Sequence, residues 1–228
     1  ATVYNIFGVE EIIVIEGACD GIGKTVQYHL LCKHMQEEGI KVIYHHFPSY
    51  GTYQAVGVEK YLQGIYGSPK TLSPYFIHNL YAHDRAITWH TDLNHYYHEG
   101  YTIVVDRYTT SSLIYQSANF EKEEEKKQFI DYVMDFEYNK MGLKEPDYII
   151  FLQAPFDLVT KLRNTRKTNE GIENDIHEKD ILFMKKVYEN SMWIADYLSW
   201  SKIQCNKGNQ MRDIQDIHKE IYSLVSHS

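Results

Sequence analysis

Short apolar runs recur along the chain, and longer segments of mixed polar and apolar residues separate them. Runs of this length, bounded by polar residues or glycine, are typical of strands that are buried on both faces of a sheet. The pattern predicts five strands, at 12–16, 41–47, 102–106, 147–152 and 202–205. Because the segments between them read as helices, it predicts an α/β fold in which helices cover both faces of a parallel sheet.

The segments between the strands show helical periodicity. Apolar residues recur at the spacing of one helix face between 72 and 89, and again near the C-terminus. We expect both stripes to face the core; they consist of Leu72, Phe76, Leu80 and Ile87, and of Ile214, Ile217, Ile221, Leu224 and Val225. The charged run EKEEEKK at 121–127 predicts the solvated start of another helix.

The polar segment 164–174 is the part of the chain with the weakest structural pattern. It contains a glycine and no apolar period, which predicts a mobile flap that carries the basic residues Arg163, Arg166 and Lys167. Asp175 and Glu178 have the spacing of a capping box, so we expect the next helix to begin there. The sequence contains no internal repeat or low-complexity linker, so we expect residues 1–228 to form a single domain with a lid at about 163–178.

Composition and charge exclude several classes of protein. With 228 residues, 43% of them hydrophobic and 24% charged, the chain resembles an ordinary globular protein. Apolar runs are too short for a membrane span and the N-terminus has no signal-peptide pattern, so we expect a cytoplasmic protein without a membrane partner. The net charge of -8 argues against a nucleic-acid surface. The three cysteines and twelve histidines lack the spacing of disulfide frameworks or zinc sites, so we expect reduced thiols and surface or core histidines.

The sequence EGACDGIGKT at 16–25 lies between an apolar strand and a predicted helix, which is the context of a phosphate-binding loop. In such a loop Gly21 and Gly23 allow close approach of the backbone, Lys24 reaches the β- and γ-phosphates, and Thr25 binds Mg²⁺. The usual spacing places a small residue at Ala18, whereas the nearest glycine, Gly17, lies one residue earlier. Either Ala18 serves as that small residue or the loop contains an extra one.

Two further patterns have the chemistry of a nucleotide site. Asp106 and Arg107 end a predicted strand, on the edge of a parallel sheet where ligands bind, so the carboxylate could hold Mg²⁺ through water and the guanidinium a phosphate. Tyr81 and Arg85 stand four residues apart on one helix face. An aromatic ring that stacks on a base, beside an arginine that binds a phosphate, would clamp a nucleotide.

Taken in order, these pieces resemble the thymidylate kinase family. The resemblance extends from about Ile12 to Val225, and it is carried by the segments IEG, DGIGKTVQ, HHFPSYG, YLQGIYG, LYAHDR, VVDRYTTSSLIYQSA, DFEYNKMGLKEPDYIIFL and DIHEKD. The most specific part is DRYTTS followed by YQSA.

The resemblance implies a P-loop NTPase-type α/β/α fold, with a five-stranded parallel sheet in the order 2-3-1-4-5 and a flexible lid that closes over ATP. It implies phosphorylation of dTMP to dTDP by in-line transfer of the γ-phosphoryl group of Mg-ATP, in pyrimidine deoxynucleotide biosynthesis, by a homodimer. The implied metal ligands are Thr25 and Asp106. The implied ATP-binding residues are Ala18, Cys19, Asp20, Gly21, Ile22, Gly23, Lys24, Thr25 and Val26.

The resemblance also implies roles for individual side chains. Asp20 would hold the 3′-hydroxyl of dTMP, Tyr115 would crowd the 2′ position of the sugar, and Gln116 would lie near the base. The full set implied for dTMP binding is Asp20, Phe47, Pro48, Tyr81, Arg85, Arg107, Ser111, Ser112, Tyr115 and Gln116. Relatives with glycine at the position of Gly21 take catalytic arginines from the flap, so the implied catalytic set is Asp20, Lys24, Arg107, Arg163 and Arg166.

Three departures from the family pattern leave alternatives open. The loop contains one extra residue, Ser112 stands where close relatives have asparagine, and Gln153 replaces an aspartate. We expect the extra residue to be absorbed at the end of the strand. One alternative is a deoxynucleoside kinase, although such enzymes typically have Glu-Arg-Ser where this chain has Asp106-Arg-Tyr. Another is a nucleotide-binding module with impaired turnover.

Overall fold

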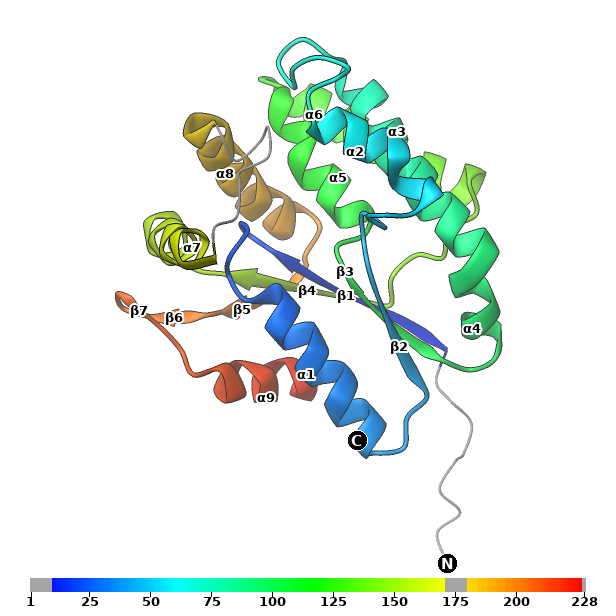
Figure 1. Cartoon of the computed structure of the whole chain (residues 1–228), viewed down its shortest axis with the longest axis vertical. Coiled ribbons are helices and arrows are strands. Elements are labelled where there is room, and N and C mark those ends of the chain that lie inside the picture. Colours follow the sequence, from blue (N-terminus) through cyan, green and yellow to red (C-terminus); the bar gives the residue numbers. More distant parts are fainter. Residues whose placement is uncertain (1–9, 171–179, 227–228) are drawn as a thin grey trace, which may run out of the picture.

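Five parallel strands form one sheet in the order β2-β3-β1-β4-β5 (Figure 1). The structure, a computed structural model, describes residues 10–170 and 180–226. The strands are β1 (Glu11–Gly17), β2 (Val42–His46), β3 (Thr102–Asp106), β4 (Tyr148–Gln153) and β5 (Ser201–Gln204). Their bounds differ from the predicted ones by no more than one residue, and the order is the expected one. A short hairpin, β6 (Asn206–Lys207) and β7 (Gln210–Met211), follows β5.

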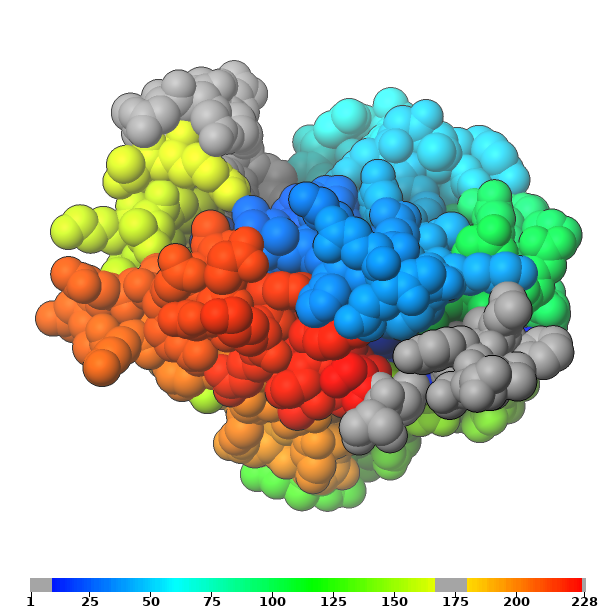
Figure 2. Space-filling model, turned by 90° about the horizontal axis from the view of Figure 1, so that it is seen from below, coloured from blue at the N-terminus to red at the C-terminus, as the bar shows by residue number. Residues whose placement is uncertain are grey.

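Alternating residues of β1 face the two layers of helices. Ile13 and Ile15 belong to a core cluster with α1 (Lys24–Glu37) and α9 (Ile214–Val225). Ile12 and Val14 belong to a cluster on the opposite face with α3 (Pro74–Thr88). Figure 2, seen from below, shows α1 in blue and α9 in red side by side across the first face. The central strand is therefore buried on both sides, as its continuous apolar run predicts.

The other helices surround the sheet, some of them packed on helices rather than on strands (Figure 1). They are α2 (Val56–Leu62), α4 (Asn94–His98), α5 (Thr109–Tyr115), α6 (Glu123–Met134), α7 (Phe156–Glu170) and α8 (Ile181–Tyr197). Single 3-10 turns occupy Tyr53–Ala55 and Ser117–Asn119, and π-helical segments occupy Trp89–Leu93 and Asp135–Lys140. α6 begins within the run EKEEEKK, which confirms the predicted helix start. No helix within the two described ranges is long and apolar enough to cross a membrane.

The buried face of α3 differs from the predicted stripe. Phe76 was expected in the core, but its side chain is 43% exposed. The neighbouring residues Ile77 and His78 are buried instead. The C-terminal stripe is partly correct, because Ile217, Ile221 and Val225 are buried whereas Ile214 and Leu224 are exposed. The error in α3 arises because polar side chains of that helix are buried against partners distant in sequence.

The segment predicted to be a flap begins as a helix. α7 continues through Glu170, because the sequence from Lys161 onward contains no proline or glycine to end it before that residue. The predicted cap at Asp175 and Glu178 lies outside the described residues. In the described part, α8 begins after Asp180, whose side chain accepts a hydrogen bond from the backbone N–H of Phe183 at 3.0 Å.

His78 is buried on the inner face of α3. Its side chain is 0% exposed, and neither ring nitrogen has a hydrogen-bond partner. Nε2 lies 3.9 Å from a carboxylate oxygen of Glu137. Burial lowers the pKa of His78 to about 3, with a further contribution from the charge of Arg85. The folded protein therefore holds this histidine in its neutral form.

We expect His78→Phe to reduce the loss of stability in acid. Below about pH 6.5 the unfolded chain binds a proton at His78 and the folded chain does not, so the wild-type protein loses stability as the pH falls toward 3. Between pH 7 and pH 5 this one group should cost about 2 kcal/mol of unfolding free energy. Urea denaturation of both proteins at the two pH values measures the difference. Equal pH dependence in the two proteins would contradict the assignment.

Candidate active site

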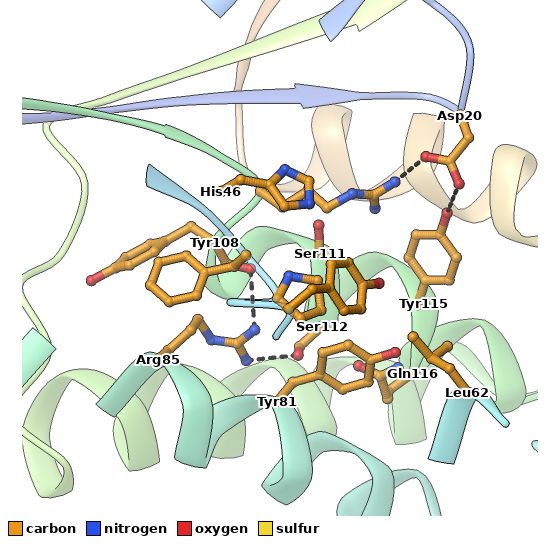
Figure 3. A pocket seen from close by; sticks show the side chains of 14 residues that line it. Asp20, His46, Leu62, Tyr81, Arg85, Tyr108, Ser111, Ser112, Tyr115 and Gln116 are labelled. Carbon is orange, nitrogen blue, oxygen red and sulfur yellow. Dashed lines mark hydrogen bonds and ion pairs between the residues drawn. The ribbon is translucent and has the colours of Figure 1, made fainter. Parts of the chain in front are cut away.

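A pocket opens at the carboxyl ends of β1, β2 and β3, the edge where parallel α/β sheets bind their ligands (Figure 3). Its walls come from the loops after these strands and from α2, α3 and α5. Every residue implied for dTMP binding lines it: Asp20, Phe47, Pro48, Tyr81, Arg85, Arg107, Ser111, Ser112, Tyr115 and Gln116. The pocket also contains four residues that the sequence did not single out, namely His46, Tyr50, Leu62 and Tyr108.

The loop between β1 and α1 has the backbone of a phosphate-binding turn. Gly21 and Gly23 have φ angles of 93° and 103°, in the left-handed region that favours glycine. A Cβ on Gly23 would meet no atom within 4 Å, so the backbone conformation rather than a lack of space requires glycine there. α1 begins at Lys24, directly after the turn. The free N–H groups of its first turn and its dipole therefore favour an anion at the loop.

The extra residue is absorbed at the end of β1. Gly17 pairs with Leu152 of β4, and the N–H of Ala18 donates to the carbonyl of Leu152 at 2.9 Å. A Cβ on Gly17 would lie 2.8 Å from Cγ2 of Ile22 and 3.0 Å from Cδ of Lys24. Ala18 is instead buried in a cluster with residues of α5, α6 and α8. The small residue beside Lys24 is therefore Gly17, so of the two alternatives left open by the sequence, the structure favours an extra residue in the loop over Ala18 as the small residue.

Asp20 lies between the two cations at the phosphate end of the pocket. Its carboxylate forms an ion pair with Arg107, and one of its oxygens lies 3.4 Å from Nζ of Lys24. Arg107 has a φ angle of 68°, which is uncommon for a residue other than glycine, and its N–H donates to the carbonyl of Ile15 at 3.3 Å. Burial raises the pKa of Asp20, but Arg107 and Lys24 outweigh it and hold the pKa well below its usual range. Asp20 is therefore a carboxylate at neutral pH.

Tyr115 closes the pocket beside this ion pair. Its hydroxyl donates to Oδ2 of Asp20 at 3.4 Å, and the guanidinium of Arg107 lies 5.6 Å from the centre of its ring. The ring face attracts the cation and the hydroxyl binds the carboxylate, so Tyr115 fixes both partners. Figure 3 shows these contacts on the Asp20 side of the pocket.

Asp106 and Thr25 meet at the base of the phosphate loop. Oγ1 of Thr25 donates to Oδ2 of Asp106 at 3.5 Å, which leaves the lone pairs of the hydroxyl available to a cation. The other carboxylate oxygen, Oδ1, is buried without a hydrogen-bond partner. Among the described residues, no group of three His, Cys, Asp or Glu side chains could hold a metal alone. The donors that are present fit Mg²⁺, which keeps several waters and shares its other ligands with nucleotide phosphates.

Arg85 lies at the opposite end of the pocket from Asp20 (Figure 3). Its guanidinium binds both carboxylate oxygens of Glu137, with distances of 2.6 Å and 3.1 Å, and donates to Oγ of Ser112 at 2.7 Å. Arg85 and Glu137 are almost completely buried. The expected phosphate clamp formed by Tyr81 and Arg85 does not fit this geometry, because Glu137 neutralises the arginine, which lies across the pocket from Asp20 of the phosphate loop.

Gln116 provides an unpaired acceptor one helical turn after Ser112, on the pocket wall. Its side chain is 2% exposed, lines the pocket, and carries a buried Oε1 without a hydrogen-bond partner. Since Oγ of Ser112 accepts from Arg85, its own proton remains available to donate. The lining of the pocket therefore combines the donors of Arg85 and Ser112, the acceptor of Gln116 and the aromatic rings of Tyr81 and Tyr108.

The two flap arginines have different positions on α7. Arg163 is 5% exposed and lies against the phosphate loop, because a Cβ on Gly21 would be 3.0 Å from Cβ of Arg163. Its Nε is buried without a hydrogen-bond partner. Arg166 is exposed. Glycine at position 21 thus makes room for Arg163 at the site.

Two other residues of interest carry no charge in the site. Burial raises the pKa of the Cys19 thiol to about 12, so it stays protonated and offers its backbone to a ligand. Gln153, where an aspartate was expected, donates from its amide to Oε1 of Gln204 at 2.9 Å. That contact links the ends of β4 and β5.

Comparisons with known proteins agree with this geometry. The family model of thymidylate kinase matches residues 15–221. The chain belongs to the thymidylate kinase family. It is 30% identical over 173 residues to thymidylate kinase of Mycobacterium tuberculosis, covering 74% of this chain and 78% of that protein. It is 26% identical over 220 residues to thymidylate kinase of Plasmodium falciparum, covering 95% and 90%. The structure of thymidylate kinase from Candida albicans aligns with a TM-score of 0.70 at 21% identity, over 96% of this chain and 91% of that one.

In this member of the thymidylate kinase family, Glu16 connects the end of β1, where the phosphate loop begins, to α5. The sequence patterns did not identify Glu16 as a residue of the site. Glu16 is completely buried at the end of β1. Its Oε2 accepts hydrogen bonds from the hydroxyls of Thr110 at 2.9 Å and Ser111 at 2.6 Å, in the first turn of α5. A glutamate next to an apolar strand was the signal available in the sequence, since a buried carboxylate requires partners.

We expect Gly17→Ala to weaken binding of ATP strongly. The new methyl group would push Ile22 and the stem of Lys24 away from their positions. The matched variant Ala18→Gly removes a methyl group one residue later, away from Lys24, and should cost stability while leaving ATP affinity within about three-fold of wild type. Calorimetric titration with ATP, together with thermal unfolding of both variants, tests the pair. If Ala18→Gly lost ATP binding and Gly17→Ala retained it, the assignment of the small residue would be wrong.

Proposed function

We propose that this protein phosphorylates dTMP to dTDP with Mg-ATP as the phosphate donor. The observation that carries the proposal is the position of Arg107, which lies between the phosphate loop and a pocket with the donors and acceptors of a pyrimidine site. One ligand phosphate on each side of this guanidinium would be held for transfer in line.

The donor nucleotide binds at the loop. The N–H of Ala18 is used by the carbonyl of Leu152, so the N–H groups from Cys19 to Val26 would surround the phosphates, and Lys24 neutralises charge on the β- and γ-phosphates. Thr25 and Asp106 would hold Mg²⁺, which neutralises the phosphates and orients them. Burial of Lys24, which is only 8% exposed, strengthens its attraction for the phosphates.

The acceptor base occupies the end of the pocket at Arg85. Thymine presents a proton at N3 and a carbonyl oxygen at C4, which match the unpaired Oε1 of Gln116 and the donors of Arg85 and Ser112. Cytosine reverses this pattern at both positions, which would leave buried polar groups unpaired. Gln116 thus supplies the acceptor that the asparagine of close relatives would have supplied at position 112. Tyr81 offers its ring for stacking on the base.

The chemistry requires positioning and charge stabilisation rather than a strong base. The phosphate of dTMP is already ionised near neutral pH, so its oxygen attacks without loss of a proton from a hydroxyl group. Lys24, Arg107 and Arg163 surround the transferring group with positive charge. Arg163 is the stronger candidate of the two flap arginines, because the stem of its side chain lies against Gly21 of the loop and its Nε is buried without a partner. Closure of the lid over the nucleotide would exclude water and limit hydrolysis of ATP.

The comparisons do not favour the alternatives. The family model and the relatives named above are all thymidylate kinases, and the extra residue that suggested a module with impaired turnover lies before the glycine turn at Gly21 and Gly23. From the family resemblance we also propose a homodimer and a cytoplasmic location, in which the enzyme serves pyrimidine deoxynucleotide biosynthesis.

A coupled assay of nucleoside diphosphate formation tests the proposed activity. We expect turnover with dTMP at about 1 to 100 per second, as for other kinases, weaker turnover with dUMP, and none with dCMP or thymidine. A reaction without acceptor measures ATP hydrolysis. Turnover with thymidine in place of dTMP would identify a nucleoside kinase, and no turnover despite binding of ATP and dTMP would identify a binding module.

We expect Arg163→Ala to lower kcat by about 100-fold or more, with little change in the affinity for dTMP, if this arginine acts mainly on the transition state. Arg166→Ala removes an exposed arginine three residues further along the same helix and should have a smaller effect. Steady-state kinetics with calorimetric dTMP titrations separates the two parameters. A loss of dTMP affinity equal to the loss of kcat in Arg163→Ala would assign Arg163 to ground-state binding instead.

A further inference from the structure

His46 is a residue of the pocket that the proposed mechanism does not use. It is the last residue of β2, and its side chain is 40% exposed at the pocket wall. Its Nδ1 lies 3.0 Å from Oδ2 of Asp106. The parallel ladder pairs His46 directly with Asp106, so the two side chains leave neighbouring strands side by side. Figure 3 shows the ring facing the pocket.

The chemistry of the contact fixes the direction of its hydrogen bond. A carboxylate only accepts, so Nδ1 of His46 carries the proton and donates it to Asp106. This holds for the neutral and for the protonated ring alike. The backbone supports the same arrangement, because the N–H of Phe47 donates to the carbonyl of Asp106 at 3.2 Å. His46 therefore has little freedom to move away from the carboxylate.

The two oxygens of Asp106 have different surroundings. Oδ2 accepts from His46 at 3.0 Å and from Thr25 at 3.5 Å, whereas Oδ1 is buried without a partner. Two donors from different elements prevent rotation of the carboxylate, and the shorter bond is that of His46. If His46 were absent, only the long bond to Thr25 would hold Oδ2, and Oδ1 could turn toward other donors.

We propose that His46 is a positioning residue that holds the carboxylate of Asp106 so that Oδ1 faces the hydrated Mg²⁺ of the bound nucleotide. The proposal rests on the Mg-nucleotide site of the proposed function. Groups that orient a metal-binding carboxylate affect metal affinity by about 10- to 100-fold in other proteins. His46 does not bind the metal itself in this scheme, since it acts only through its bond to Asp106.

Calorimetric binding of a non-hydrolysable ATP analogue, with excess Mg²⁺ and with EDTA, tests the proposal without turnover. The ratio of the two affinities measures the contribution of the metal. In His46→Leu, which lacks a donor, this ratio should fall by about ten-fold, while the affinity in EDTA stays within about two-fold of wild type. His46→Asn has an amide N–H that can replace Nδ1 as the donor to Asp106, so it should restore most of the ratio.

His98→Leu provides the control, because His98 is an exposed histidine of α4 and does not line the pocket. If His46→Leu failed to fold, as judged by thermal unfolding, His46→Ala would replace it. Three results would overturn the proposal. The ratio in His46→Leu could equal that of the wild type, His46→Asn could fail to restore the ratio, or the affinity of the wild-type protein could be independent of Mg²⁺. The His46 variants could change the ratio as predicted while the wild-type protein formed no dTDP. That result would support this inference and reject the proposed function.

Discussion

The register of the parallel ladder is the constraint on which the site depends. Asp106 pairs with Ile15 on one side and with His46 on the other, so β2 and β3 end at the same level and β1 extends two residues further. Neighbouring strands lie about 4.8 Å apart, and the phosphate loop, the Phe47 turn and Arg107 therefore begin close together. A slip of one residue would turn the apolar side chains of a strand to its other face. Because both faces of β1 and β3 are filled by packed helices, the core that stabilises the fold also fixes the geometry of the site.

Three charged groups of the site already have partners before a ligand arrives. Arg85 and Glu137 form a buried pair, Asp20 and Arg107 form a partly buried pair, and Glu16 accepts hydrogen bonds from hydroxyls of α5. Loss of one partner from a buried pair commonly costs about 3–5 kcal/mol, because the other charge is left without compensation. These contacts therefore hold the side chains in one arrangement, at the cost of removing charge from water. Despite the net charge of -8, the cations Lys24, Arg107 and Arg163 all lie at the phosphate loop, where they attract anionic nucleotides.

Sequence patterns predicted the strands and the phosphate loop well, since both depend on local residue spacing. Family resemblance predicted the pocket residues. The remaining features depend on contacts that spacing does not encode. The spacing of Tyr81 and Arg85 predicts a phosphate clamp, because it does not show the partner Glu137, which lies 52 residues away in the sequence. His46 was dismissed as a surface or core histidine, because only the pairing of β2 with β3 places it beside Asp106.

The extra loop residue shows which part of the motif must be kept. An insertion between Gly21 and Lys24 would shift the left-handed glycines relative to the first turn of α1 and misdirect the N–H groups. An insertion before Ala18 only lengthens the strand, and the chain gains a ladder bond to Leu152 in place of a bulge. The stem of Lys24 then lies against the strand one residue earlier than the usual spacing suggests, so the glycine requirement moves to Gly17. Glycine is therefore required at the residue of the strand that contacts the lysine side chain, and not at a fixed number of residues before the lysine.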